Sequence, residues 1–372
     1  MNIAFPPKAF GTDARAFAGL QELFVNGFEN PNGRSGVVRV SLRDRPDLTY
    51  LAEFRDHLAI SRNEPDRAAD TEIEFTPDTL ALIFDEYEFL DWRDPRVIGS
   101  TRVSGDKGLA FHLGLSCLRP SDDTQTRFEI IEALHDRREY RALPEIPRLH
   151  RPSQMDILDA IEDSAPLIAT GVAPDADGGD WTLERLCDRF GDSVVTIRSA
   201  TERITMRAFV EELRRVQADW AGGGATDAST YTNGSPLPAE MWDAFGPLYF
   251  DKEDFVPPQL WFGATPTNRP ATNLHRDTMT GFLHQVIGRK RLDLYSADQA
   301  PLVYPMKAYN SYQRCWFDPN APDFDAFPAA KAATPISIEL APGELLIQPA
   351  GWFHQVFALE SPTMSVSYFW RY

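Results

Sequence analysis

The sequence has few of the features that mark exported, membrane-bound or thiol-based proteins. Its cysteines, Cys117, Cys187 and Cys315, lie far apart and form no CxxC pair, so neither a disulfide framework nor a thiolate zinc site is predicted. No run of about 18 uncharged apolar residues occurs, and the first residues show no basic segment followed by an apolar one. We therefore expect a cytoplasmic protein without a membrane partner.

The chain is also short of positive charge. It has 37 Lys and Arg against 55 Asp and Glu, a formal net charge of −18. A surface this acidic repels phosphate backbones and anionic lipids, so we expect no nucleic-acid partner. The 43% of hydrophobic residues is typical of a folded globular protein and not of a disordered one.

A length of 372 residues predicts two domains. Residues 1–145 are expected to form an α+β domain, and a basic, proline-punctuated stretch (RREYRALPEIPRLHRP) marks the boundary near residue 145. The hydrophobic periodicity predicts helices over 11–28 and 77–90, and strands over 37–42, 71–75 and 102–109, the last interrupted at Gly105-Asp106.

Residues 146–372 are expected to begin with a helical lead-in and to continue as an all-β barrel. Short strands separated by Gly and Pro turns favour a sandwich or barrel over a doubly wound sheet. We expect helices over 153–163, 182–190 and 205–218, and strands over 194–197, 259–263, 282–287, 291–295, 336–340, 345–348, 355–359 and 363–370. The stretch 221–235 between helix and barrel is predicted to be a mobile surface loop in which nothing requires a ligand.

One histidine has a carboxylate two residues further on within the strand-rich region. Residues i and i+2 of a strand project to the same face, so His275 and Asp277 can meet one cation there, with His354 from another strand as third ligand. Two imidazoles and one carboxylate form the facial triad of non-haem Fe(II) oxygenases. A surface His-Arg-Asp turn is the alternative.

The motifs around this triad resemble the JmjC/cupin-like 2-oxoglutarate oxygenases, in particular the subgroup with the asparaginyl hydroxylase of hypoxia-inducible factor. The matching segments are LWFGATPTNRPATNLHRDTMTGFLHQVIGRKRLDLYSADQAPLVYP, APGELLIQPAGWFHQV and SVSYFW, and about residues 147–372 are covered. The resemblance implies a double-stranded β-helix (jelly-roll or cupin) barrel. It also implies that Fe(II), 2-oxoglutarate and O₂ are required.

Site residues follow from the same resemblance. His275, Asp277 and His354 match the iron ligands. Lys290 matches the lysine that pairs with the distal carboxylate of 2-oxoglutarate, and a surface lysine is the alternative. Thr272 matches a hydroxyl that helps to hold that carboxylate, although an ordinary strand threonine is the competing interpretation.

The sequence departs from the family at two positions that orient the metal-proximal end of 2-oxoglutarate. Gly281 stands where several relatives have asparagine, and Tyr368 stands where one relative has asparagine. We keep Tyr368 among the predicted cosubstrate-binding residues. Three further predictions concern the surroundings of the site: His284 is a satisfied structural residue, Trp352 and Phe353 are core aromatics, and Tyr304, Tyr309 and Asn310 form a substrate rim.

The first domain resembles the sterol-carrier-protein fold, in which a strand, a helix and a glycine-containing turn build an apolar tunnel. The matching residues are Gly99, Val103, Gly105, Asp106, Leu109 and Ala110. The resemblance implies an apolar ligand. A structural or dimerising domain with a filled core is the alternative, so a homodimer stays open.

The activity implied is oxidative decarboxylation of 2-oxoglutarate, with release of succinate and CO₂ and hydroxylation of an unactivated C–H. We expect a small or carrier-borne substrate, with a protein side chain (Asn, Asp, His, Arg or Lys) as the alternative. A non-catalytic, metal-containing protein that carries an apolar ligand is a competing hypothesis of another class. A cupin-type isomerase or hydrolase is a third, but its usual set of three histidines and a glutamate is missing.

Overall fold

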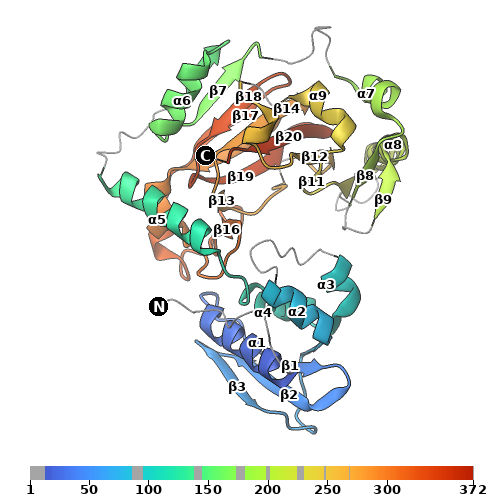
Figure 1. Cartoon of the computed structure of the whole chain (residues 1–372), viewed down its shortest axis with the longest axis vertical. Helices are drawn as coiled ribbons and strands as arrows, with labels where there is room; N and C mark the ends of the chain where they lie inside the picture. Colours follow the sequence, from blue (N-terminus) through green and yellow to red (C-terminus); the bar gives the residue numbers. More distant parts are fainter. Residues whose placement is uncertain are drawn as a thin grey trace. The chain divides into compact units, whose positions relative to one another are not determined.

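The computed structural model of the chain divides into two compact units (Figure 1). The first contains residues 1–126, 304–316 and 323–328, and the second contains 127–303, 317–322 and 329–372. The described residues are 13–85, 95–137, 145–172, 181–197, 202–223, 230–246, 249–267 and 269–371. In this part of the chain, the helices are too short or too polar to cross a bilayer.

The first unit is a five-stranded sheet with helices on one face. Its elements are α1 (Asp13–Gly27), β1 (Gly36–Leu42), β2 (Arg45–Phe54), β3 (Leu58–Arg62), β4 (Thr71–Phe75), α2 (Pro77–Asp85), α3 (Pro95–Ser100), β5 (Arg102–Gly105), α4 (Lys107–Leu115) and β16 (Tyr312–Arg314). The strand order is β3-β2-β1-β4-β5, with β1 antiparallel to β2 and parallel to β4. The unit is thus α+β, as expected.

The alternation of residues along β1 separates the two faces of this sheet. Val38 and Val40 are fully buried, and they pack with Phe24 of α1 and Leu113 of α4 in one hydrophobic cluster. Arg39 between the two valines points to the opposite, polar face, because successive strand residues alternate. The amphipathic pattern of 11–28 predicted helix α1, and the apolar side of this helix, which includes Phe24, faces the sheet as expected.

One predicted element of this unit is wrong in its second half. The predicted strand 102–109 ends at Gly105 as β5, and α4 begins at Lys107. The Asp106 carboxylate accepts hydrogen bonds from the amides of Gly108 and Leu109, which makes it an N-cap. Strands β2 and β3 were not predicted, and the predicted helix end beyond Asp85 lies outside the described residues.

The second unit is a two-sheet barrel with helices on its outside. Its elements are β6 (Arg148–His150), α6 (Gln154–Glu162), β7 (Leu167–Thr170), α7 (Leu183–Phe190), β8 (Val194–Thr196), β9 (Arg203–Thr205), α8 (Met206–Ala221), β10 (Thr230–Tyr231), β11 (Ser235–Pro236), α9 (Trp242–Phe245), β12 (Gln259–Ala264), β13 (His275–Asp277), β14 (Gly281–Ile287), β15 (Lys290–Tyr295), α10 (Ala300–Val303), β17 (Ile336–Leu340), β18 (Leu345–Gln348), β19 (Phe353–Ala358) and β20 (Thr363–Phe369). The expected helical lead-in followed by β structure is confirmed.

The two sheets have distinct orders and enclose a common interior. One sheet runs β10-β12-β20-β14-β18-β7-β6, with β11 also paired to β12, and the other contains β13-β19-β15-β17. Leu292 and Leu294 of β15 pack with Leu346 of β18, so side chains of both sheets meet between them. This arrangement is the jelly-roll or cupin architecture that the sequence predicted.

The outer face of the larger sheet is covered by helices. Phe209 of α8 and Phe245 of α9 pack in one cluster with Phe262 of β12 and Val366 of β20. Because successive residues of a strand point to opposite faces, every second residue of β20 faces these helices and the residues between them face the barrel interior. This alternation decides below which side chains can reach the site.

Helix α5 (Asp122–Arg137) explains why the division falls at residue 126 and not near 145. Its second half packs on β13: the guanidinium of Arg276 lies 4.0 Å from the ring centre of Phe128 and pairs with Glu132 at 2.8 Å. Residues 127–137 are thereby fixed to the barrel.

Candidate metal centre

Two neighbouring strands bring the three predicted ligands together. β13 pairs antiparallel with β19, and the register sets His275 directly opposite His354. Asp277 lies two residues along β13 and therefore on the same face as His275. One candidate ligand atom from each residue lies within 4.8 Å of the others. The centres of the two imidazole rings are 4.2 Å apart. These separations suit a shared coordination sphere.

Burial sets the charges of this cluster. His354 Nε2 lies 3.7 Å from the Asp277 carboxylate. Burial raises the pKa of Asp277, and His275 acts in the opposite direction. Burial and the neighbouring His275 lower the pKa of His354 well below its ordinary value. An ionised carboxylate in this largely enclosed place is stabilised by a nearby cation, which a divalent metal would supply.

The Nδ1 nitrogens of both histidines have partners within the protein. His275 Nδ1 lies 2.7 Å from the carbonyl oxygen of Asn273. His354 Nδ1 lies 2.7 Å from the side-chain amide of Gln348 and 3.4 Å from the carbonyl oxygen of Trp352. Contacts of this kind orient a histidine for metal binding.

Lys290 is buried on the interior face of β15. Its side chain is 2% exposed, and its ammonium donates hydrogen bonds to the hydroxyls of Tyr231 (3.0 Å) and Ser365. Among the described residues, no carboxylate lies within ion-pair distance of it. Burial alone lowers its pKa to about 7. The alternative of a surface lysine is therefore wrong.

The residue that contacts Lys290 corrects another prediction. The stretch 221–235 was expected to be a surface loop without a ligand role, but Thr230–Tyr231 and Ser235–Pro236 are strands paired to β12. Tyr231 is buried, and its hydroxyl meets the Lys290 ammonium. Residues 224–229 of that stretch lie outside the described residues. A single tyrosine after a Gly- and Ala-rich run gave no periodic signal.

Tyr368 does not lie where the sequence placed it. Its hydroxyl donates a hydrogen bond to the carbonyl oxygen of Gly246, and its ring packs in the helix-covered cluster. Ser365, which meets Lys290, lies three positions earlier and therefore on the other face of β20. This is a correction: the Tyr368 side chain lies on the helix-covered face of β20 and not on the interior face, where a cosubstrate-binding residue was expected.

Of the remaining predicted residues, one stays a prediction and three lie as expected. Thr272 accepts a hydrogen bond from the backbone amide of Val356 at 3.2 Å, so its role toward a cosubstrate stays a prediction. His284 Nδ1 lies 3.1 Å from the carbonyl oxygen of Phe245, and burial lowers its pKa to about 4, which fits the predicted structural histidine. Trp352 and Phe353 are fully buried, as expected of core aromatics.

The predicted substrate rim falls in the first unit. Tyr304, Tyr309 and Asn310 belong to the segment 304–316, which this unit incorporates. Asn310 is 5% exposed, so most of its side chain is unavailable to a ligand in this structure. A role of these residues toward a substrate stays a prediction.

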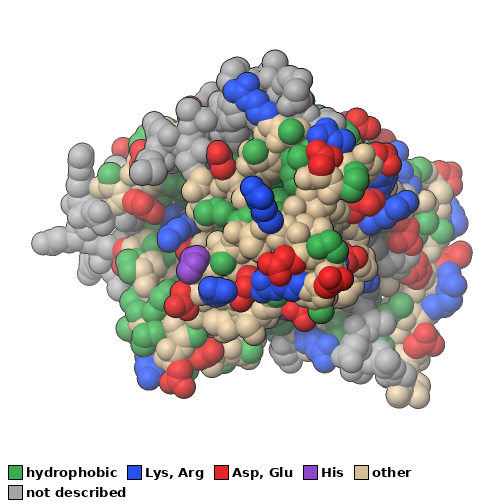
Figure 2. Space-filling view, turned by 90° about the horizontal axis from the view of Figure 1, so that it is seen from below, with side chains coloured by type: hydrophobic (Ala, Val, Ile, Leu, Met, Phe, Trp, Pro, Cys, Tyr) green, Lys and Arg blue, Asp and Glu red, His purple; other side chains and the backbone are tan. Residues whose placement is uncertain are grey.

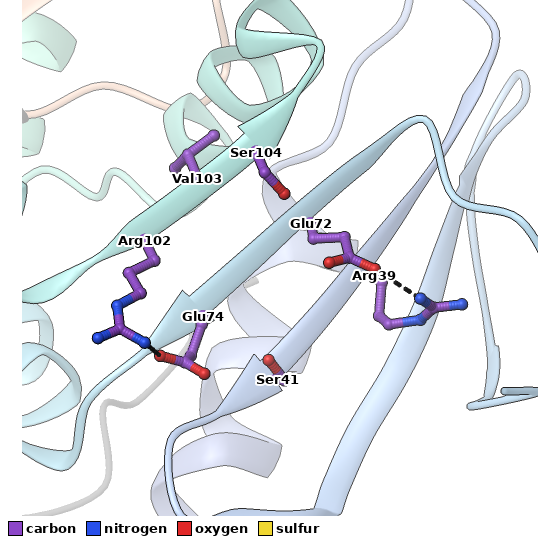
Figure 3. A pocket seen from close by; sticks show the side chains of 7 residues that line it. All are labelled: Arg39, Ser41, Glu72, Glu74, Arg102, Val103 and Ser104. Carbon is purple, nitrogen blue, oxygen red and sulfur yellow. Dashed lines mark hydrogen bonds and ion pairs between the residues drawn. The ribbon is translucent and has the colours of Figure 1, made fainter.

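The first unit has a hollow on the polar face of its sheet. This hollow of about 470 Å³ is lined by Arg39, Ser41, Glu72, Glu74, Arg102, Val103 and Ser104 (Figure 3). Arg39 pairs with Glu72 at 2.6 Å and Arg102 with Glu74 at 3.5 Å, so the charges largely neutralise one another. On the surface shown in Figure 2, acidic and basic side chains are likewise interspersed. The apolar tunnel expected for this unit stays a prediction.

Comparisons with known proteins found a matching family and several relatives. The family described as "Cupin-like domain" matches residues 152–372. Lysine-specific demethylase 8 of Danio rerio is 26% identical over 242 residues, which are 61% of this chain and 58% of that protein. tRNA wybutosine-synthesizing protein 5 of Gallus gallus is 29% identical over 183 residues, 47% of this chain and 48% of that protein.

A third relative matches a shorter region. Lysine-specific demethylase 8 of Xenopus tropicalis is 33% identical over 118 residues, 32% of this chain and 26% of that protein. The chain thus spans between 26% and 58% of the length of these three relatives.

Proposed function

Because the chain belongs to the Cupin-like domain family, we propose that it is an Fe(II)- and 2-oxoglutarate-dependent oxygenase. The observation that carries this proposal is the meeting of His275, Asp277 and His354 in one barrel that also buries Lys290 without an anionic partner among the described residues. The finer resemblance, to the asparaginyl hydroxylase of hypoxia-inducible factor, stays a prediction.

The donor atoms fit the proposed metal. Two imidazole nitrogens and one carboxylate oxygen on one face are the protein ligands of non-haem Fe(II) oxygenases, and they leave positions for small molecules. The charge also fits, because two neutral imidazoles and one carboxylate offset one of the two positive charges of the metal. The remaining charge suits an anionic cosubstrate.

Lys290 fits the far end of that cosubstrate. A buried ammonium group is costly unless it meets an anion, and the Tyr231 hydroxyl beside it can also donate a hydrogen bond to a carboxylate. The Ser365 hydroxyl accepts from the ammonium and donates its own proton to the side-chain oxygen of Gln285, so it orients the lysine. We therefore propose that Lys290 and Tyr231 bind the distal carboxylate of 2-oxoglutarate, with Thr272 as a further donor.

When bound, Fe(II) and 2-oxoglutarate supply oxidative decarboxylation, which yields succinate and CO₂ and oxidises the substrate with O₂. The residues of this chain bind the metal, orient the cosubstrate and keep water away. Trp352, which is fully buried and packs with Leu292 and Leu346 in the barrel interior, keeps that side of the centre dry. Phe353 packs against Arg276 on the other face of β19.

We propose hydroxylation of a small or carrier-borne substrate as the reaction. A protein side chain is the second candidate, and the lysine named in the demethylase relatives favours its inclusion. Purified protein should be incubated with Fe(II), 2-oxoglutarate and either a metabolite mixture or a peptide library. Extra succinate in one arm and a mass increase of one oxygen identify the class.

The activity itself is tested without the substrate. We expect Fe(II) and 2-oxoglutarate to give slow succinate formation by uncoupled turnover, and Asp277→Ala to lower it at least 100-fold because a metal ligand is lost. Asp298→Ala removes an exposed carboxylate outside the centre and should leave the rate unchanged. Equal succinate from wild type and Asp277→Ala would refute the proposed function.

A further inference from the structure

The side-chain amide of Gln348 lies against one of the three candidate ligands. Its Nε2 atom is 2.7 Å from His354 Nδ1, whereas the other neighbour of that nitrogen, the carbonyl oxygen of Trp352, is 3.4 Å away. Gln348 is the last residue of β18 and is 8% exposed. A buried amide so placed has a strong effect on the ring that it contacts.

The chemistry of the ring decides which amide atom must face it. A neutral imidazole has one N–H and one nitrogen with a free lone pair, and only the latter binds a metal. His354 Nε2 is the nitrogen that faces Asp277, at 3.7 Å, so Nε2 is the ligand atom and Nδ1 must carry the proton. The amide atom at 2.7 Å from Nδ1 must then accept a hydrogen bond.

We propose that Gln348 is a positioning residue for the metal centre, an inference that rests on the proposed function. Its amide oxygen accepts the Nδ1 proton of His354, which fixes the tautomer whose Nε2 binds the metal and holds the ring in place. The oxygen reaches this position by a half-turn of the amide, because oxygen and nitrogen then exchange places.

The orientation of the Gln348 amide decides which nitrogen of His354 carries the proton. In the structure, the amide nitrogen donates to the Trp352 carbonyl at 3.3 Å and also faces Nδ1. A donor that faces Nδ1 favours the tautomer in which Nε2 carries the proton, and that tautomer cannot bind a metal through Nε2. The bond to Trp352 is long and is given up for a short bond to Nδ1. Gln348 thus determines whether His354 is ready to bind a metal.

The neighbouring strand leaves room for this role. Gly281 of β14 pairs directly with Gln348 and presents no side chain that could compete for His354. A Cβ atom at Gly281 would meet ring carbons of Phe369 at 3.6 and 3.9 Å, which is ordinary contact. The amide that contacts His354 therefore comes from β18 and not from β14.

The test compares two replacements of Gln348 in the full chain. Gln348→Leu keeps the approximate size but removes the acceptor, whereas Gln348→Glu keeps an acceptor oxygen and removes the amide nitrogen. Co(II) affinity should be measured by titration calorimetry and by the d–d absorption of the bound ion. We expect Gln348→Leu to weaken Co(II) binding by about 10- to 100-fold, and Gln348→Glu to bind within about threefold of wild type or more tightly.

A second glutamine serves as a control for replacing a hydrogen-bonded glutamine by leucine elsewhere in the same unit. Gln299 of the same unit makes two hydrogen bonds with the backbone of Thr334, at 3.0 and 2.8 Å, away from the centre. Gln299→Leu should leave Co(II) affinity and its absorption spectrum unchanged. Circular dichroism of each variant shows whether it is folded.

The outcomes separate this inference from the proposed function. If wild type does not bind Co(II), the proposed function fails. If wild type binds but Gln348→Leu binds equally well, or Gln348→Glu is weakened as much as Gln348→Leu, the inference is wrong.

A measurement on wild type needs no variant. Nitrogen-15 NMR of histidine-labelled, Zn(II)-loaded protein should show His354 Nδ1 protonated and Nε2 bound to the metal. An unprotonated Nδ1 would overturn the inference.

Discussion

At the scale of single residues, Lys290 is the group whose charge depends most directly on its surroundings. It is a cation in a barrel interior, and its contacts among the described residues are neutral hydroxyls. Burial lowers its pKa to about 7, so in the free protein it loses its proton near neutral pH. A bound carboxylate would favour the protonated form and raise this pKa again.

This shift predicts how cosubstrate binding depends on pH. Above pH 7 the free protein must take up a proton to present the ammonium, so the 2-oxoglutarate concentration for half-maximal succinate formation should rise, by up to about tenfold per pH unit. Lys290→Met should raise this concentration at every pH and flatten its rise above pH 7. Steady-state assays from pH 6.5 to 8.5 measure both effects.

An exposed lysine gives the control for this experiment. Lys307 in the first unit is 76% exposed, so Lys307→Met should keep the wild-type pH profile. An equally steep rise in Lys290→Met would show that another group controls the dependence.

At the scale of elements, the metal-bearing strand β13 is held from behind by helix α5. Arg276 lies between the two ligands of β13 and points away from them: it is 3% exposed, stacks 4.0 Å from Phe128 and 5.0 Å from Phe353, and pairs with Glu132. The guanidinium contacts both aromatic rings, so much of its contribution is packing and cation–π attraction.

Loss of this side chain should be costly. We expect Arg276→Ala to lower the free energy of unfolding by about 2–4 kcal/mol, because it leaves a gap between α5 and β13. Arg214→Ala breaks an exposed pair with Glu184 and should cost less than about 1 kcal/mol. Urea unfolding of the two variants measures the difference, and equal costs would mean that Arg276 does not hold α5.

The elements also show how far the sequence could predict this protein. Most strands of the barrel were found because short β-type runs are separated by Gly and Pro turns, whereas β13 itself was not among the predicted strands. The HxD spacing placed two ligands on one face. Gly105-Asp106 was correctly read as an interruption, but the helix that follows it was missed because a cap is a local hydrogen bond that hydrophobic periodicity does not record. Tyr231 was missed because its contact joins it to Lys290, a residue distant in sequence. Gln348 lies close to His354 in sequence, but the turn between β18 and β19 that brings the two side chains together leaves no periodic signal.

At the scale of the whole molecule, the first unit is completed by a segment from the C-terminal half of the sequence. Glu29, after α1, accepts hydrogen bonds from the Lys307 amide at 2.7 Å and the Trp316 indole at 3.0 Å. The ring of His112 in α4 lies 5.1 Å from that of Trp316. The segment 304–316 leaves the barrel sequence between β15 and β17, so neither half of the chain alone contains the complete first unit.

This shared construction predicts that a change late in the sequence loosens a helix near its beginning. Trp316→Ala should lower the hydrogen-exchange protection of α4 amides, because the indole that packs against His112 and bonds Glu29 is lost. Trp242→Ala removes a partly buried indole of the second unit that bonds Leu237, and it should leave α4 unchanged. If instead Trp316→Ala leaves α4 as protected as in wild type, residues 1–126 form a domain that needs no help from the barrel segment.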